Sequence, residues 1–184
     1  YSEGFTPHPK ISIALPLPPG VTGAAELMDI SLYRRWQPEP FVEQVRPQLP
    51  SGIDVSDARE VPASAKALQA IVQAAEYHIL VADARPAEEM RRAIHDLLAA
   101  CHLPREWVRE KGIRRYDLRP LVHRLWLAGR EQGCWLLGMV LAASAQGTGR
   151  PEEVLLSLGC AARARDIHRV RVILGEDYCG WRRD

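Results

Sequence analysis

The chain has 184 residues, with 24 Lys and Arg against 23 Asp and Glu, so its formal net charge is +1. Its composition, 47% hydrophobic and 26% charged, is ordinary for a globular protein and excludes disordered, collagen-like and fibrous classes. No apolar run approaches the roughly 18 residues of a transmembrane helix, so we expect no membrane partner. The near-zero charge argues against a strongly basic nucleic-acid coat but leaves a local basic face open, because steering depends on charge distribution.

The first third predicts strands and one short helix. The chain starts with YSEGFTPHPK, which lacks the basic and apolar regions of a signal peptide and suggests a piece of something longer. Apolar and polar residues alternate over 10–17 and again over 26–33, which predicts two half-buried antiparallel strands. Helical spacing over 41–49 predicts a helix that Pro47 keeps short. A third strand is expected over 53–61.

The remaining two thirds predict a more regular order of elements. The apolar stripe over 85–103 is the clearest helical pattern in the chain, with acidic residues in its first turn. The expected order is strand 76–83, helix 85–103, a hairpin insertion near 105–118, strands 121–128 and 134–143, helix 151–161 and strand 168–175. Without the hairpin this is β-α-β-β-α-β, the ferredoxin-like or split βαβ pattern.

These patterns predict an α+β fold of two ferredoxin-like repeats. Residues 1–62 would form an incomplete repeat, because their order is β-β-α-β and lacks a leading strand and helix of roughly 30 residues. Residues 63–75 are expected to be a helical connector, residues 76–175 the complete repeat, and residues 176–184 a tail.

Three segments carry a family resemblance: YSEGFTPHPKISIALPLPPG, AELMDISL and RRYDLRPLV. Together they resemble the radical SAM-linked (radical SAM-associated) proteins, a bacterial domain of unknown function found fused to, or encoded beside, radical SAM proteins. The resemblance covers most of the chain and is densest over 1–32. It implies a radical SAM protein or domain as partner and a further strand and helix upstream. It supplies no catalytic residues.

The cysteines argue against a metal or cluster site. Cys101, Cys134, Cys160 and Cys179 are too far apart for a zinc ribbon or for the CxxxCxxC loop of a radical SAM cluster. This chain is therefore not itself the radical SAM enzyme, and we expect no metal and no cofactor. With no secretory signal the thiols predict a cytoplasmic protein. Cys101 and Cys134 are expected in the core.

His8 is the one weak catalytic candidate. Two flanking prolines hold it on a stiff loop beside Lys10, where its imidazole could bind phosphate or act as a general base. A rigid turn with a polar surface residue explains the same pattern. No second acid or nucleophile is spaced to complete a catalytic group.

Two sets of arginines are candidate binding residues. Residues 105–124 hold seven Lys and Arg against three Asp and Glu, which predicts a phosphate-contacting patch at Arg114, Arg115 and Arg119. Salt bridges to Asp117 on a solvated hairpin are the alternative.

A second candidate surface is the sheet face that the helices of a ferredoxin-like fold leave open. Strand alternation directs Arg124, Trp126, Arg169 and Arg171 toward that face, and arginines beside an aromatic ring are typical of RNA-binding sheets. No RNP-type aromatic motif is present. The alternative is that this face packs on the other repeat or on a partner.

Three functional hypotheses follow. The favoured one is a non-catalytic accessory domain of a radical SAM protein that helps recognise RNA or a ribosome-associated substrate. The second is a protein-interaction module that docks on the radical SAM domain and binds no nucleic acid. The third is an RNA-processing or RNA-modifying enzyme that uses His8.

Overall fold

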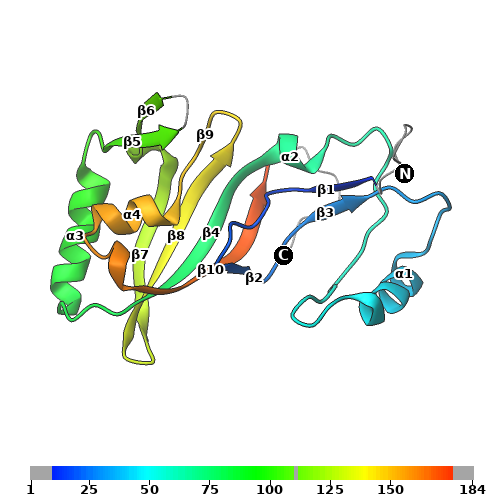
Figure 1. Cartoon of the computed structure of the whole chain (residues 1–184), viewed down its shortest axis with the longest axis horizontal. Coiled ribbons are helices and arrows are strands. Elements are labelled where there is room, and N and C mark those ends of the chain that lie inside the picture. Colours follow the sequence, from blue (N-terminus) through cyan, green and yellow to red (C-terminus); the bar gives the residue numbers. More distant parts are fainter. Residues whose placement is uncertain (1–9, 110–111, 176–184) are drawn as a thin grey trace.

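The computed structural model describes residues 10–109 and 112–175. Its central element is a mixed sheet (Figure 1), in which neighbouring strands are antiparallel except that β2 runs parallel to β10. The strands lie in the order β2 (Val21–Gly23), β10 (Ala164–Leu174), β4 (Val72–Val81), β8 (Cys134–Ser144) and β7 (Val122–Glu131), and the short β9 (Gly147–Thr148) pairs with the end of β8.

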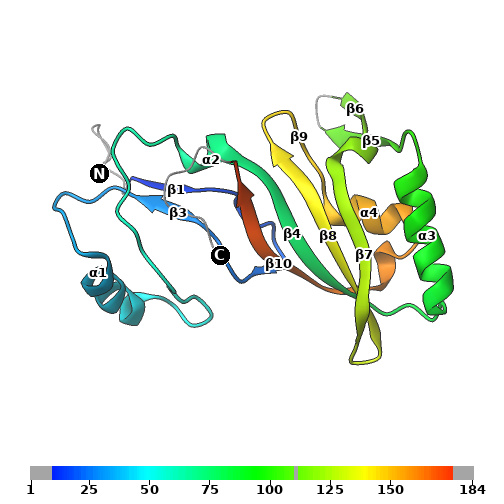
Figure 2. The same cartoon turned by 180° about the vertical axis from the view of Figure 1, so that it is seen from behind.

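Two helices cover one face of this sheet. They are α3 (Ala87–Ala99) and α4 (Pro151–Ser157). The stripe of Met90, Ile94 and Leu97 on α3 is buried, because its apolar side chains recur at helical spacing and pack on the sheet. β8 is apolar on both faces, as expected for a central strand. Figure 2 shows the sheet from the other side, which we call the open face.

Along the chain, the sheet is built from two β-α-β units, β4-α3-β7 and β8-α4-β10, whose strands interleave in the sheet. The elements predicted from residue 76 onward are therefore present in the expected order. The insertion predicted near residues 105–118 is a hairpin as expected, formed by β5 (Pro104–Arg109) and β6 (Gly112–Asp117). The molecule is a mixed α+β protein with a core built mainly on the sheet.

The N-terminal part differs from the predicted repeat. The two expected strands pair antiparallel as β1 (Ile11–Ile13) and β3 (Met28–Ile30), and the short helix is α1 (Pro38–Val45) with a 3-10 turn over 46–48. Residues 53–61 form no strand, and the connector contains only the one-turn helix α2 (Leu68–Ile71) before β4 starts at Val72. The arrangement of two ferredoxin-like repeats is not confirmed.

The physical reason is that residues 10–62, the described part of this segment, form no core of their own. α1 buries none of its residues, and Ile53 is 60% exposed. The small second cluster beneath α2 joins Ala14 to Leu68 and to residues of the main sheet. The segment thus adds to the edge of the main sheet through β2. The prolines around residues 16–19 interrupt the alternating pattern, so the sequence does not predict this strand.

Arg169 ties the N-terminal segment to the sheet. Its side chain is 1% exposed, and its guanidinium donates to both carboxylate oxygens of Glu26 and to the carbonyl of Leu15. The Nε–Oε1 distance is 2.7 Å. A buried guanidinium is stable only with such partners, because it has lost its water.

We expect Arg169→Met to lower the free energy of unfolding by about 3 kcal/mol, the lower end of the cost of breaking a buried ion pair, since Glu26 keeps some solvent access. Arg171→Met is the matched control two residues along β10. Its pair with Glu76 is exposed on the arginine side, so we expect a loss of about 1 kcal/mol or less. Urea unfolding measures both, and equal losses would contradict the assignment.

Candidate functional site

A row of five residues crosses the open face, one from each strand. The strand registers place Thr22 opposite His168, His168 opposite His78, His78 opposite Gly138, and Gly138 opposite Trp126. Side chains directly opposite one another lie on the same side of a sheet. Their strand neighbours Tyr77, Ile79, Leu137 and Met139 pack in the core with residues of α3 and α4. Strand alternation therefore places the two imidazoles and the indole on the opposite face, the one turned to the viewer in Figure 2.

The indole of Trp126 lies across β8. A Cβ built on Gly138 would lie 2.1 Å from Cε2 of Trp126, so the ring occupies the space of the absent side chain. His78 meets the indole edge to face, with ring centroids 6.3 Å apart and planes at 84°. The Arg124 guanidinium carbon lies 5.1 Å from the ring centroid, within the range of a cation–π contact.

Polar groups continue the site toward β10. Arg171 donates to Glu76 through Nε at 2.9 Å, and Oε1 of Glu76 lies 3.8 Å from Nε2 of His78. Thr22 Oγ1 and His168 Nδ1 are 2.7 Å apart. The Thr22 contact orients the His168 ring, and the Glu76 carboxylate lies near the His78 ring. Within the described ranges no three His, Cys, Asp or Glu side chains are grouped closely enough to hold a metal ion.

Of the residues predicted for the open face, Arg124, Trp126 and Arg171 lie there, and the prediction for Arg169 is wrong. β10 contains a register shift between Arg169 and Arg171, where Val170 is the extra residue. Such a β-bulge reverses the alternation of side chains, so Arg169 faces Tyr77 on the helix-covered side. Burial raises the pKa of Tyr77, against the opposing effect of its hydrogen bond with Arg169.

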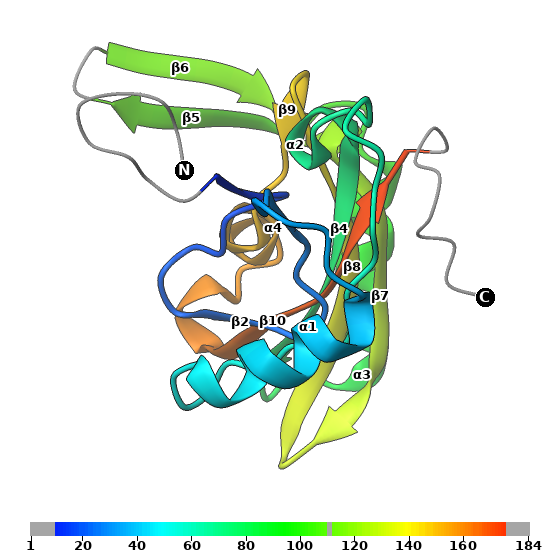
Figure 3. The same ribbon diagram turned by 90° about the vertical axis from the view of Figure 1, so that its right-hand side faces the viewer.

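The basic hairpin is a separate surface. Figure 3 shows β5 and β6 projecting on the side of α4, away from the open face. Arg115 pairs with Glu106 at 2.8 Å, and Arg119 donates to the carbonyls of Leu98 and Val122. The side chain of Arg114 lies outside the described part. Arg115 and Arg119 are thus already bonded within the protein, but neither side chain pairs with Asp117 as the sequence suggested, because the Asp117 carboxylate is bound by His102 and by backbone N–H groups.

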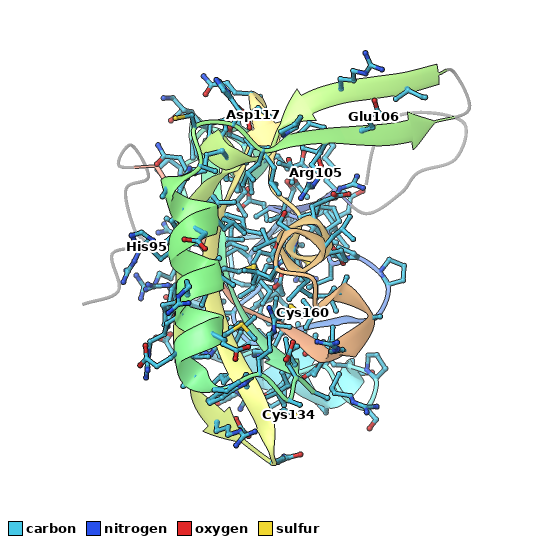
Figure 4. All side chains as sticks on the ribbon, turned by 90° about the vertical axis from the view of Figure 1, so that its left-hand side faces the viewer. His95, Arg105, Glu106, Asp117, Cys134 and Cys160 are labelled. Carbon is cyan, nitrogen blue, oxygen red and sulfur yellow. The ribbon has the colours of Figure 1, made fainter. Side chains whose placement is uncertain are left out.

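Asp117 fixes the root of this hairpin, beside Arg105 and the end of α3 (Figure 4). Its carboxylate accepts hydrogen bonds from the backbone N–H groups of Leu103 and Arg119, and it lies 2.8 Å from His102 Nδ1. The Leu103 N–H, the His102 contact and the Arg119 N–H, in that order of size, lower the pKa of Asp117 to about 2. The sequence singled out Asp117 only as a salt-bridge partner of arginines.

The other predicted residues do not join the open-face row. Lys10 is exposed beside the start of β1, and His8 lies outside the described residues. Cys101 is exposed, not buried, because α3 ends at Ala99 and the chain leaves the helix before reaching it. Cys134 is half-buried.

Sequence reasoning missed His78, His168 and Gly138. Each lies in a strand, where the alternation of side chains predicts which face of the sheet the residue lies on. Their grouping depends on the pairing of β10, β4 and β8, which lie far apart in sequence.

The geometry defines an α+β protein with a helix-covered sheet and an aromatic, basic row on its open face. The chain belongs to a family described as an uncharacterised protein conserved in bacteria (DUF2344), whose model matches residues 1–151. No curated protein and no solved structure matches the chain. No helix in the described ranges is long and apolar enough to span a membrane.

The low pKa of Asp117 predicts acid-sensitive anchoring of the hairpin. Because the folded-state pKa lies below the ordinary 3.8, the carboxylate stabilises the fold above that value and loses its effect as the pH falls toward 2. The stability difference between wild type and Asp117→Asn should be largest near neutral pH and shrink between about pH 4 and pH 2. Urea unfolding at several pH values measures it. The exposed Asp96→Asn on α3 is the control, and a difference constant with pH would contradict the assignment.

Proposed function

We propose that this protein is an accessory domain that binds RNA through the open face of its sheet. The observation that carries the proposal is the row of Trp126, His78 and His168 with Arg124 stacked on the indole. Aromatic rings with neighbouring arginines on an exposed sheet are how many RNA-binding modules hold bases and phosphates.

The availability of Arg124 supports this assignment. The side chain of Arg124 is exposed, and it forms no hydrogen bond or ion pair with any other described residue. Its guanidinium can therefore bind a phosphate without breaking an internal bond. Arg171 is exposed at the other end of the face, although its pair with Glu76 must be shared. The strand registers place both cations in one row, opposite Glu76 and Val140, alongside the row of aromatic rings. This arrangement suits a strand whose phosphates follow the arginines and whose bases lie on the rings.

The topology adds weaker support. The strand order β10-β4-β8-β7 with two interleaved β-α-β units is that expected of one ferredoxin-like unit, with β2 and the β5–β6 hairpin as additions. We infer a ferredoxin-like relationship for residues 72–174. The same fold serves many functions, so the proposal rests on the surface residues.

A second candidate, docking on a radical SAM protein, is favoured by a different surface. The β1–β3 ribbon exposes Ile11, Ile13, Met28 and Ile30, which pair across the two strands and are 38% to 54% exposed. An isolated two-stranded ribbon is marginal in water, so a covering partner would stabilise it. The radical SAM protein is the partner that the family resemblance implies. Catalysis by His8 remains a prediction.

Salt-dependent binding tests the RNA proposal. Fluorescence anisotropy with a labelled RNA at about 50 and 200 mM salt should give affinity that falls with salt. Arg124→Ala should weaken binding roughly tenfold and reduce the logarithmic salt slope by about 0.7, the value for one phosphate contact to a single strand. Arg92→Ala, an exposed arginine on α3, should leave both unchanged. Absence of salt-dependent binding would refute the proposal.

Co-purification tests the docking candidate. A radical SAM protein from the same genome, co-expressed with this chain, should co-purify with wild type and be lost with Ile13→Asp, because a buried carboxylate at an apolar interface is costly. Ile113→Asp changes another exposed isoleucine, 60% exposed against 42% for Ile13, on the β5–β6 ribbon and should retain the partner. Loss in both variants, or in neither, would count against docking at β1–β3.

A further inference from the structure

We propose that the ligand of the open face is an unpaired nucleobase of single-stranded RNA, held against Trp126 in the corner between the indole and His78. This inference rests on the RNA-binding function proposed above and deepens it, because it names the part of the ligand that the site recognises. It follows from the shape and chemistry of three side chains and one glycine.

The indole of Trp126 lies directly over Gly138. The Cβ of any other residue at this position would lie within 2.1 to 2.6 Å of Cε2, Cζ2 and Nε1 of Trp126. Such distances are below van der Waals contact, so the ring lies where it does only because residue 138 has no side chain. Trp126 is only half-buried, and its remaining surface is available to a flat ligand.

His78 and Arg124 define the boundaries of the corner. The imidazole stands at 84° to the indole, and the guanidinium lies 5.1 Å from the indole centroid. A flat heteroaromatic ring can stack on one of these surfaces while its edge meets another, and such stacking on aromatic side chains is how proteins hold the bases of single strands. The corner therefore matches the shape and π surface of a nucleobase.

Hydrogen-bonding groups surround the corner. His168 faces His78 across the strands with its ring fixed by Thr22, whereas Glu76 is only 14% exposed and is bound by Arg171. Arg171 is a cation beside Glu76, and with Arg124 it can bind the phosphates on either side of the base. An abasic polyanion would use only the two arginines, whereas a nucleotide in a strand would use the whole row.

The base must be unpaired. In a duplex each base is stacked on both faces by its neighbours, and its Watson–Crick edge is occupied. The indole is fixed on the sheet, so it cannot intercalate as a projecting side chain would. A single strand presents the exposed π face and the free edge that the corner can contact.

Three ligands of equal length and label separate this inference from the RNA-binding proposal. They are a single-stranded RNA, the same RNA annealed to its complement, and a fully abasic phosphodiester strand. For wild type, anisotropy should give an affinity for the single strand about tenfold or more above that for the abasic strand, and above that for the duplex. Equal affinity for all three, with normal salt dependence, would overturn the base inference and leave RNA binding intact. No binding to any of them would overturn both.

Variants locate the effect on the corner. Trp126→Ala should bring the single strand down to the affinity of the abasic strand, and Trp126→Phe should restore part of the difference. Gly138→Ala keeps every aromatic and charged group but displaces the indole, so it should also remove most of the preference for the intact strand. If Gly138→Ala proves unfolded by circular dichroism, His78→Ala replaces it and should reduce the same preference. Variants that fold and retain the full preference would refute the assigned corner.

Discussion

The buried pair of Arg169 and Glu26 is the interaction on which the arrangement of the N-terminal segment depends. A guanidinium on the helix-covered side of the sheet would cost several kcal/mol without its partners, so the chain must bring Glu26 and the Leu15 carbonyl to it. This requirement holds the chain around residues 15–26 beside β10 and lets β2 pair with its edge. The added strand also covers an edge that would otherwise expose unpaired backbone groups.

A single β-bulge connects this pair to the open face. Because Val170 is an extra residue in β10, Arg169 and Arg171 face opposite sides of the sheet although they are two residues apart. Arg169 then fixes the N-terminal segment, and Arg171 binds Glu76 beside the two imidazoles. The same irregularity in β10 therefore serves both the fold and the candidate site.

The sequence predicted what depends on local pattern and missed what depends on distant pairing. The stripe of Met90, Ile94 and Leu97 identifies α3, and the continuous apolar run identifies β8 as central. Alternation alone cannot reveal a bulge, so it predicts the wrong face for Arg169. The parallel pairing of β2 with β10 joins residues 146 positions apart, and no periodicity in a three-residue strand between prolines and glycines could indicate it.

Charge counted along the sequence differs from charge available to a ligand. The excess of positive charge is greatest in the hairpin, yet Arg105, Arg115 and Arg119 bond there to carboxylates, a hydroxyl and backbone carbonyls. A phosphate would have to replace those partners, and exchanging one bond for another yields little net free energy. Arg124 belongs to the same basic stretch, but within the described part of the chain it forms no hydrogen bond or ion pair and lies over the indole of Trp126. An anion at Arg124 gains a new bond and loses none, which makes the open face the better site for a polyanionic ligand.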